Sequence, residues 1–173
     1  MQSRDAYLDA LGVTQWVLRA SAAAPAPASA AAEGAGPPVQ WLLVDSFAHD
    51  PVNRIDAAFA SEVGQLMAAM LRAVELSPQQ VLVAAADDQL PALAASRRPR
   101  LMLALGEAAS QALSGRILSL DALRGSVHSW GAQRTALVAS YHPAQLLRDA
   151  SLKRKAWDDL KLARANTSRT EDA

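Results

Sequence analysis

Short apolar runs alternate along the chain with stretches in which apolar residues recur every three or four positions. The runs at Gln40–Val44, Gln80–Ala84 and Arg100–Leu105 are short and continuous, which is typical of buried strands in a parallel sheet. Between the first two runs, the pattern predicts a helix over Asp56–Glu75. Its apolar stripe consists of Val63, Leu66, Met67, Met70, Leu71 and Val74. Strands that alternate with helices predict a three-layer α/β sandwich with a mostly parallel central sheet.

The rest of the domain continues this pattern. A short helix is predicted over Asp87–Ala95, interrupted by Pro91, and a second over Glu107–Leu113, which Gly115 would end. Gly106, between strand and helix, predicts close packing of the two. The segment 117–124 reads as irregular. Residues 126–130 and 134–139 predict a β-hairpin, and an amphipathic helical segment follows as far as residue 162.

The N-terminal part has a different composition. Residues 1–20 carry a compact apolar pattern around Trp16, and residues 21–38 are rich in Ala and Pro. A flexible linker of that length spans roughly 20–25 Å. Two interpretations stay open for the first segment, a flap on its own domain or a tethered peptide for another protein, and the linker favours the second. The predicted organisation is a peptide (1–20), a linker (21–38), an α/β domain (39–165) and a polar tail (166–173).

Charge and cysteine content narrow the function classes. Seventeen basic and seventeen acidic residues give a formal net charge of zero, so weak or no direct nucleic-acid binding is expected. The absence of Cys excludes thiolate catalysis, thiolate zinc sites and iron–sulfur clusters. We expect no cofactor and no metal. No stretch approaches the ~20 apolar residues of a membrane span, so a cytoplasmic protein is the expectation.

The chemistry-bearing stretch is the Tyr-His-Pro-Ala turn at 141–144, which follows an apolar strand and precedes a helix containing Trp157. With the Leu-Arg-Gly at 123–125 and the strand ending at Gly106, it resembles the uracil-DNA glycosylase superfamily over about the last seventy residues. That resemblance implies a glycosylase-like fold in which His142 would stabilise the departing base. The family's first motif, with its Gly, carboxylate and Pro, is missing. Ser46 stands nearest the carboxylate position, and Asp45 could substitute as the acid.

The first twenty residues and the segment at 76–82 resemble the psi subunit family of the bacterial DNA polymerase III clamp-loader complex. This resemblance implies that the α/β domain binds the chi subunit, which contacts single-stranded-DNA-binding protein. It also implies a peptide that binds the clamp-loader subunits. The peptide's binding residues would be Leu11, Val13, Thr14, Gln15, Trp16 and Leu18.

Three functions therefore stay open, of which the first below is the leading hypothesis and the least specific is a domain of this fold with an unrelated protein partner. The first is a non-catalytic bridging subunit in DNA replication, favoured by the zero net charge and the lost first motif. The second is a uracil-DNA glycosylase, or an inactive relative, acting through His142 and favoured by the intact Tyr-His-Pro-Ala turn.

Overall fold

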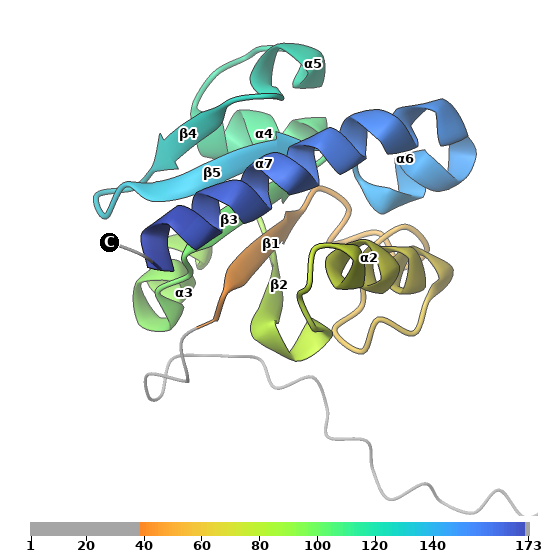
Figure 1. The fold of residues 1–173 in the computed structure, drawn as a ribbon, viewed down its shortest axis with the longest axis horizontal. Coiled ribbons are helices and arrows are strands. Elements are labelled where there is room, and N and C mark those ends of the chain that lie inside the picture. The colour runs from red at the N-terminus through yellow and green to blue at the C-terminus, as the bar shows by residue number, and fades with distance from the viewer. Residues whose placement is uncertain (1–38, 172–173) are drawn as a thin grey trace, which may run out of the picture. The chain divides into compact units, whose positions relative to one another are not determined.

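The computed structural model describes residues 39–171. The predicted peptide and linker, with the six partner-binding residues, lie outside this range, as do residues 172 and 173. The described part forms the α/β sandwich predicted from the sequence (Figure 1).

The elements follow one another as strand and helix for most of the chain. The strands are β1 (Trp41–Asp45), β2 (Val81–Ala85), β3 (Leu101–Leu105), β4 (Val127–Trp130) and β5 (Thr135–Ser140). The α-helices are α2 (Glu62–Ala73), α3 (Leu90–Arg97), α4 (Glu107–Ser114), α5 (Leu120–Leu123), α6 (Pro143–Arg148) and α7 (Lys153–Glu171). Short 3-10 turns, η1 (Pro78–Gln80) and η2 (Ala150–Leu152), precede β2 and α7.

The five strands form one sheet in the order β2-β1-β3-β5-β4. The first four are parallel, and only β4 runs antiparallel, paired with β5 in the predicted hairpin. In the sheet, β2 lies on one side of β1, and β3 lies on the other side. The direction in which successive strands are added therefore reverses between β1 and β3. In open α/β sheets, that reversal is where ligand sites form.

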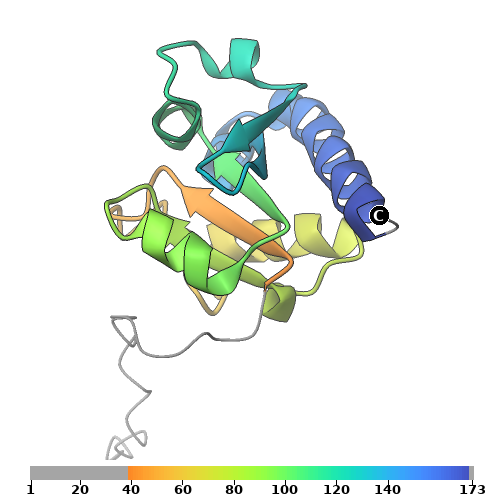
Figure 2. The same ribbon diagram turned by 90° about the vertical axis from the view of Figure 1, so that its left-hand side faces the viewer.

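Helices cover both faces of the sheet, which explains the continuous apolar runs. On one face, alternate residues such as Leu43 and Leu103 pack against α2 and α7. On the other face, Val44 and Met102 pack against α3 and α4. Figure 2 shows the sheet between these two helical layers. Because strands buried on both faces carry no polar alternation, they read in the sequence as unbroken apolar segments.

Two predicted helices differ from the expectation for local reasons, and one short helix was not predicted. Helix α2 begins at Glu62 rather than Asp56 because the Asp56 carboxylate accepts hydrogen bonds from Ala60 and Ser61 in a turn that precedes the helix. Helix α3 is not interrupted by Pro91, which stands in its first turn, where a missing N–H costs nothing. The segment predicted to be irregular contains the single turn α5.

Helix α7 corrects the predicted domain end. It continues through Glu171, beyond the boundary expected at residue 165, so the segment 166–171 is helical rather than a polar tail. Thr167 is fully buried, and its hydroxyl accepts a 2.9 Å hydrogen bond from the indole N–H of Trp41. This contact joins the end of α7 to the start of β1. Neither α7 nor any other helix in the described part is long and apolar enough to cross a membrane.

The Trp41–Thr167 contact gives the first testable prediction. Thr167→Val keeps the side-chain shape but leaves the buried indole N–H without an acceptor, so we expect a loss of about 1–2 kcal/mol in unfolding free energy. Chemical denaturation measures it. Ser168→Ala, one residue along the same helix, removes a hydroxyl that bonds only its own helix and is the matched control. Equal stability of the two variants would contradict a role for the end of α7 in the core.

Candidate functional site

The predicted site residues meet at the carboxyl edge of the sheet, at the reversal between β1 and β3. Asp45 is the last residue of β1, and Gly106 follows β3. His142 follows β5, next but one to β1 in the sheet order. Residues 97 positions apart in the chain are therefore brought together because parallel strands end at the same edge.

Asp45 and His142 form a buried pair. The Nε2 atom of His142 lies 2.9 Å from Oδ1 of Asp45, and both side chains are fully buried. The ring N–H does not point well along this line, since Nε2 lacks an aligned hydrogen bond. The pair is thus a close polar contact between the imidazole and the carboxylate. The structure thus brings together the two residues that the sequence analysis named for the glycosylase alternative.

The Asp45 carboxylate also organises the loop after β1. Its Oδ1 accepts a 2.7 Å hydrogen bond from the Phe47 N–H, and its Oδ2 accepts a 2.8 Å bond from the Ile55 N–H. Burial alone raises the pKa of Asp45, but the contact with His142 and the two backbone donors outweigh it, so the pKa is lowered overall. The carboxylate is therefore ionised at neutral pH and serves as a structural acceptor.

His142 is enclosed on every side. Its Nδ1 accepts a 3.1 Å hydrogen bond from the Ala144 N–H, so the imidazole caps the start of α6. In the neutral ring this acceptor role leaves the proton on Nε2, facing Asp45. The Phe47 ring packs edge-on against the imidazole, with centroids 4.8 Å apart. A base-excising histidine must touch the extruded base, and a side chain with 0% exposure touches none in this conformation.

Ser46 caps the N-terminus of helix α4. Its hydroxyl oxygen accepts a 2.9 Å hydrogen bond from the Ala109 N–H, which supplies the cap that Gly106, the N-cap of α4, has no side chain to make. A Cβ on Gly106 would lie 2.8 Å from this hydroxyl oxygen, and the residue has φ of 91°. The absence of a side chain at Gly106 thus makes room for Ser46 and His142, rather than for the strand–helix contact predicted from the sequence. The residue nearest the family's carboxylate position is here a helix cap.

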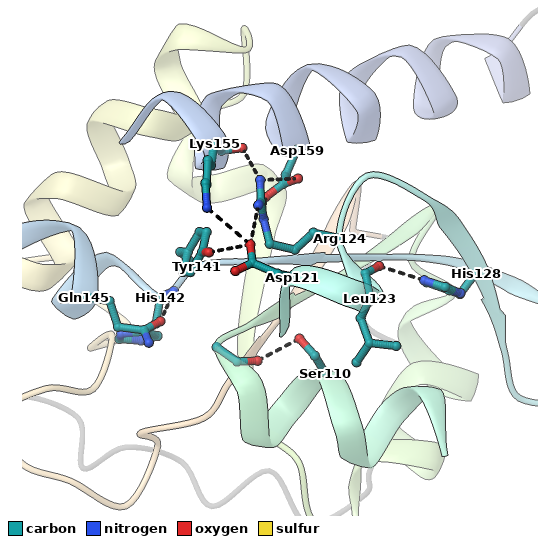
Figure 3. A network of polar contacts seen from close by, with 11 residues as sticks. Ser110, Asp121, Leu123, Arg124, His128, Tyr141, His142, Gln145, Lys155 and Asp159 are labelled. Carbon is teal, nitrogen blue, oxygen red and sulfur yellow. Dashed lines mark hydrogen bonds and ion pairs between the residues drawn. The ribbon is translucent and has the colours of Figure 1, made fainter. Parts of the chain in front are cut away.

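Tyr141, the residue before His142, is held by a different set of contacts. Tyr141 donates a 2.7 Å hydrogen bond to Asp121, and the Arg124 guanidinium lies over its ring, 4.7 Å from the centroid. Arg124 also makes a two-pronged ion pair with the buried Asp159 of α7, at 2.7 and 3.1 Å. Figure 3 shows Arg124 reaching from the end of α5 to α7, between Tyr141 and Asp159. The Tyr-His-Pro turn is thus held by α5 and α7 on one side and by Asp45 on the other.

The sequence analysis identified part of this arrangement. It named His142 and Asp45 but not the capping role of Ser46 or the buried ion pair of Arg124 with Asp159. The signal for the pair was the Leu-Arg-Gly at 123–125, because an Arg in an otherwise apolar and turn-forming segment requires an acceptor. Nothing near Arg124 in the sequence points to Asp159.

The Asp45 contacts predict a pH-dependent loss of stability. Asp45→Asn replaces one acceptor oxygen with an amide that cannot accept, so one backbone N–H loses its partner, and we expect a cost of about 2 kcal/mol at pH 7. The folded-state pKa of Asp45 is lowered from its ordinary value of 3.8. The ionised carboxylate therefore stabilises the fold fully only at pH values above this ordinary pKa. The stability gap between wild type and variant should narrow as the pH falls below that value. A gap that is constant between pH 7 and 3 would contradict this role.

The Ser46 cap predicts a loss confined to one hydroxyl. Ser46→Ala should lower the unfolding free energy by about 1 kcal/mol, as expected for the loss of a helix N-cap. Ser119 also occupies an N-cap position, at α5, but its side chain makes no capping hydrogen bond. Ser119→Ala is therefore the matched control, expected to be nearly neutral in thermal denaturation. A reversed order of the two variants would show that the Ser46 contact is not stabilising.

Comparison with known proteins agrees with this geometry. A family model described as the uracil DNA glycosylase superfamily matches residues 47–161, well over half of the chain. The match begins at Phe47, directly after Asp45 and Ser46, and so extends far beyond the last seventy residues over which the resemblance was traced in the sequence. No curated protein matched the chain.

Proposed function

The chain belongs to the uracil-DNA glycosylase superfamily, and we propose that it is a non-catalytic member of it, a psi-type subunit of the DNA polymerase III holoenzyme. In this role, the N-terminal peptide binds the clamp-loader subunits, and the α/β domain binds chi. Through chi, the protein is linked to single-stranded-DNA-binding protein during replication. It acts by holding proteins together in the cytoplasm rather than by chemistry.

The observation that carries this proposal is the enclosure of His142. The imidazole caps α6, faces Asp45 and packs against Phe47, with no exposed surface. Exposing it requires breaking the Asp45 contacts that also hold the loop after β1. A domain that keeps the family fold but uses its histidine inside the core is suited to a binding role.

The identity of the proposed partner rests on the sequence of residues 1–38, which lie outside the described residues. Its segment 1–20 resembles the psi family, and the Ala/Pro stretch at 21–38 would let this peptide reach a neighbouring protein. The zero net charge supports protein partners over direct binding to DNA, which requires a positive surface. The binding residues proposed for the peptide remain those predicted from the sequence.

One observation favours the enzymatic alternative. His142 and Asp45 stand together at the carboxyl edge of the sheet, where ligand sites form in this architecture. An active glycosylase would have to open the 46–55 loop, free His142 from both neighbours and create space for a base. The excision assay below distinguishes this alternative from the proposed function.

We predict that Trp16→Ala weakens binding to a reconstituted clamp-loader pentamer from the same source at least about thirtyfold, since buried Trp anchors at interfaces often contribute 2 kcal/mol or more. The thermal midpoint should stay nearly unchanged, because in this proposal the peptide binds a partner protein and does not pack into the domain core. Surface plasmon resonance with the full chain measures the first quantity and calorimetry the second. Trp157→Ala, which alters a half-exposed Trp of α7, is the matched control and should retain pentamer binding.

The same preparation is assayed for uracil excision from single-stranded DNA under single-turnover conditions, and none is expected. Excision that disappears in His142→Ala, without pentamer binding, would replace the proposed function with the glycosylase alternative. A large fall in the thermal midpoint of Trp16→Ala would instead assign the N-terminal segment to the chain's own core.

A further inference from the structure

An apolar groove runs between α2 and α7 on the sheet face that these helices cover. Its volume is about 250 Å³. The groove, called the α2/α7 groove below, is lined by Leu66, Ala69, Met70, Ala73, Leu146, Lys153, Trp157 and Leu160. In Figure 1, α2 and α7 lie on the same side of the sheet, with α6 at one end of both. Neither Asp45 nor His142 lines the groove; Leu146, which does, donates its backbone N–H to the His142 carbonyl at 3.3 Å.

The spacing of the lining residues shows that the groove is more than leftover core surface. On α2, the four lining residues recur at helical spacing on a stripe beside the buried one, and Ala69 and Ala73 are exposed. On α7, Lys153 and Trp157 stand one turn apart, and the Trp157 side chain is 38% exposed. A wall of small residues opposite a large aromatic leaves room for side chains of a second helix.

The lining of the groove carries one charged residue. This residue is Lys153, and no ion pair of Lys153 is found within the described residues. Two acidic residues in or beside these helices are paired within the chain, Asp158 with Lys161 at 2.7 Å and Glu75 with Arg164 at 3.2 Å, whereas Glu62, one turn before Leu66, has no ion pair within the described residues. An approaching segment therefore meets an apolar surface with a positive charge available at its edge.

We propose that the α2/α7 groove is the surface on which the α/β domain binds its partner, and that the partner presents an amphipathic helix with acidic residues beside its apolar stripe. Apolar side chains of that helix pack between Trp157 and the two alanines, and a carboxylate pairs with Lys153. Helix-in-groove recognition has this form, with anchors at i, i+3, i+4 and i+7. The identification of this partner with chi rests on the proposed function, whereas the chemistry of the groove does not.

Two other occupants fit less well. The chain's own first twenty residues carry Arg4 and Arg19 against Asp5 and Asp9, so they offer no acidic excess to Lys153. A second copy related by a twofold axis would place the same patch against itself, bringing Lys153 near its own counterpart and leaving two concave surfaces face to face. Charge and shape both favour an acidic helix from a different protein.

The test measures binding of the chi-type subunit from the same source to the full chain. Trp157→Ala and Lys153→Glu should each weaken the Kd at least about tenfold, and the loss in Lys153→Glu should shrink at high salt. Ile117→Ala is the matched apolar control, because Ile117 is 94% exposed on a loop that does not line the groove. Trp16→Ala should leave this affinity unchanged, while Trp157→Ala should leave pentamer binding unchanged.

The outcomes separate the inference from the proposed function. If chi binds the wild type and both groove variants equally, the groove assignment is overturned and the proposed function stands. If chi does not bind the wild type, the chi part of the proposed function fails, and a Glu-rich amphipathic helical peptide with Leu at i, i+3, i+4 and i+7 tests the groove by itself. Binding of this peptide that is lost in Trp157→Ala supports the inference, and no preference over a Lys-rich peptide with the same Leu positions overturns it.

Two further results would assign the groove to another occupant and overturn the inference. Tighter chi or peptide binding after deletion of residues 1–20 would show that the chain's own N-terminal segment competes for it. A dimer of the full chain in analytical ultracentrifugation that dissociates in Trp157→Ala would show that a second copy occupies it.

Discussion

The structure around the candidate site depends on one buried carboxylate. Asp45 ends β1, accepts the backbone N–H groups of Phe47 and Ile55, and faces the imidazole of His142. A charged group at this depth is stable only while its acceptors are used, because an unpaired buried charge costs several kcal/mol. The same carboxylate thus fixes the loop after β1, the direction of that loop across the sheet edge, and the position of the histidine.

In this structure, the carboxyl edge of the sheet is closed by the chain's own side chains. The resemblance noted in the sequence implies a histidine that reaches an extruded base, which requires an open pocket. Here, the histidine caps α6, and Ser46 caps α4 at the place where the fold offers free amides. Arg124 and Asp159 hold the neighbouring Tyr141. The polar groups at this edge form hydrogen bonds with one another rather than with a ligand, so the edge of the sheet is part of the core.

With that edge closed, the recognition surfaces that we propose lie elsewhere. One is the N-terminal peptide around Trp16, and the other is the groove beside Trp157 on α7. In each case, an aromatic side chain is the main anchor, as in many protein interfaces. A bridging protein benefits from two anchors that can be changed independently, because each contact can then be broken without disturbing the other.

The sequence by itself determined the architecture, because strands buried on both faces and helices with one apolar stripe leave periodic signals within a few residues. It also named His142 and Asp45 for one site, through the resemblance to the glycosylase superfamily. Only the tertiary structure decided what that site is. Whether His142 is open or enclosed depends on where the 46–55 loop folds, and that follows from backbone N–H groups meeting Asp45, which no side-chain pattern records. For the same reason, the helical end of α7 could not be foreseen: its polar residues are ordered by Thr167 accepting from Trp41, 126 positions away.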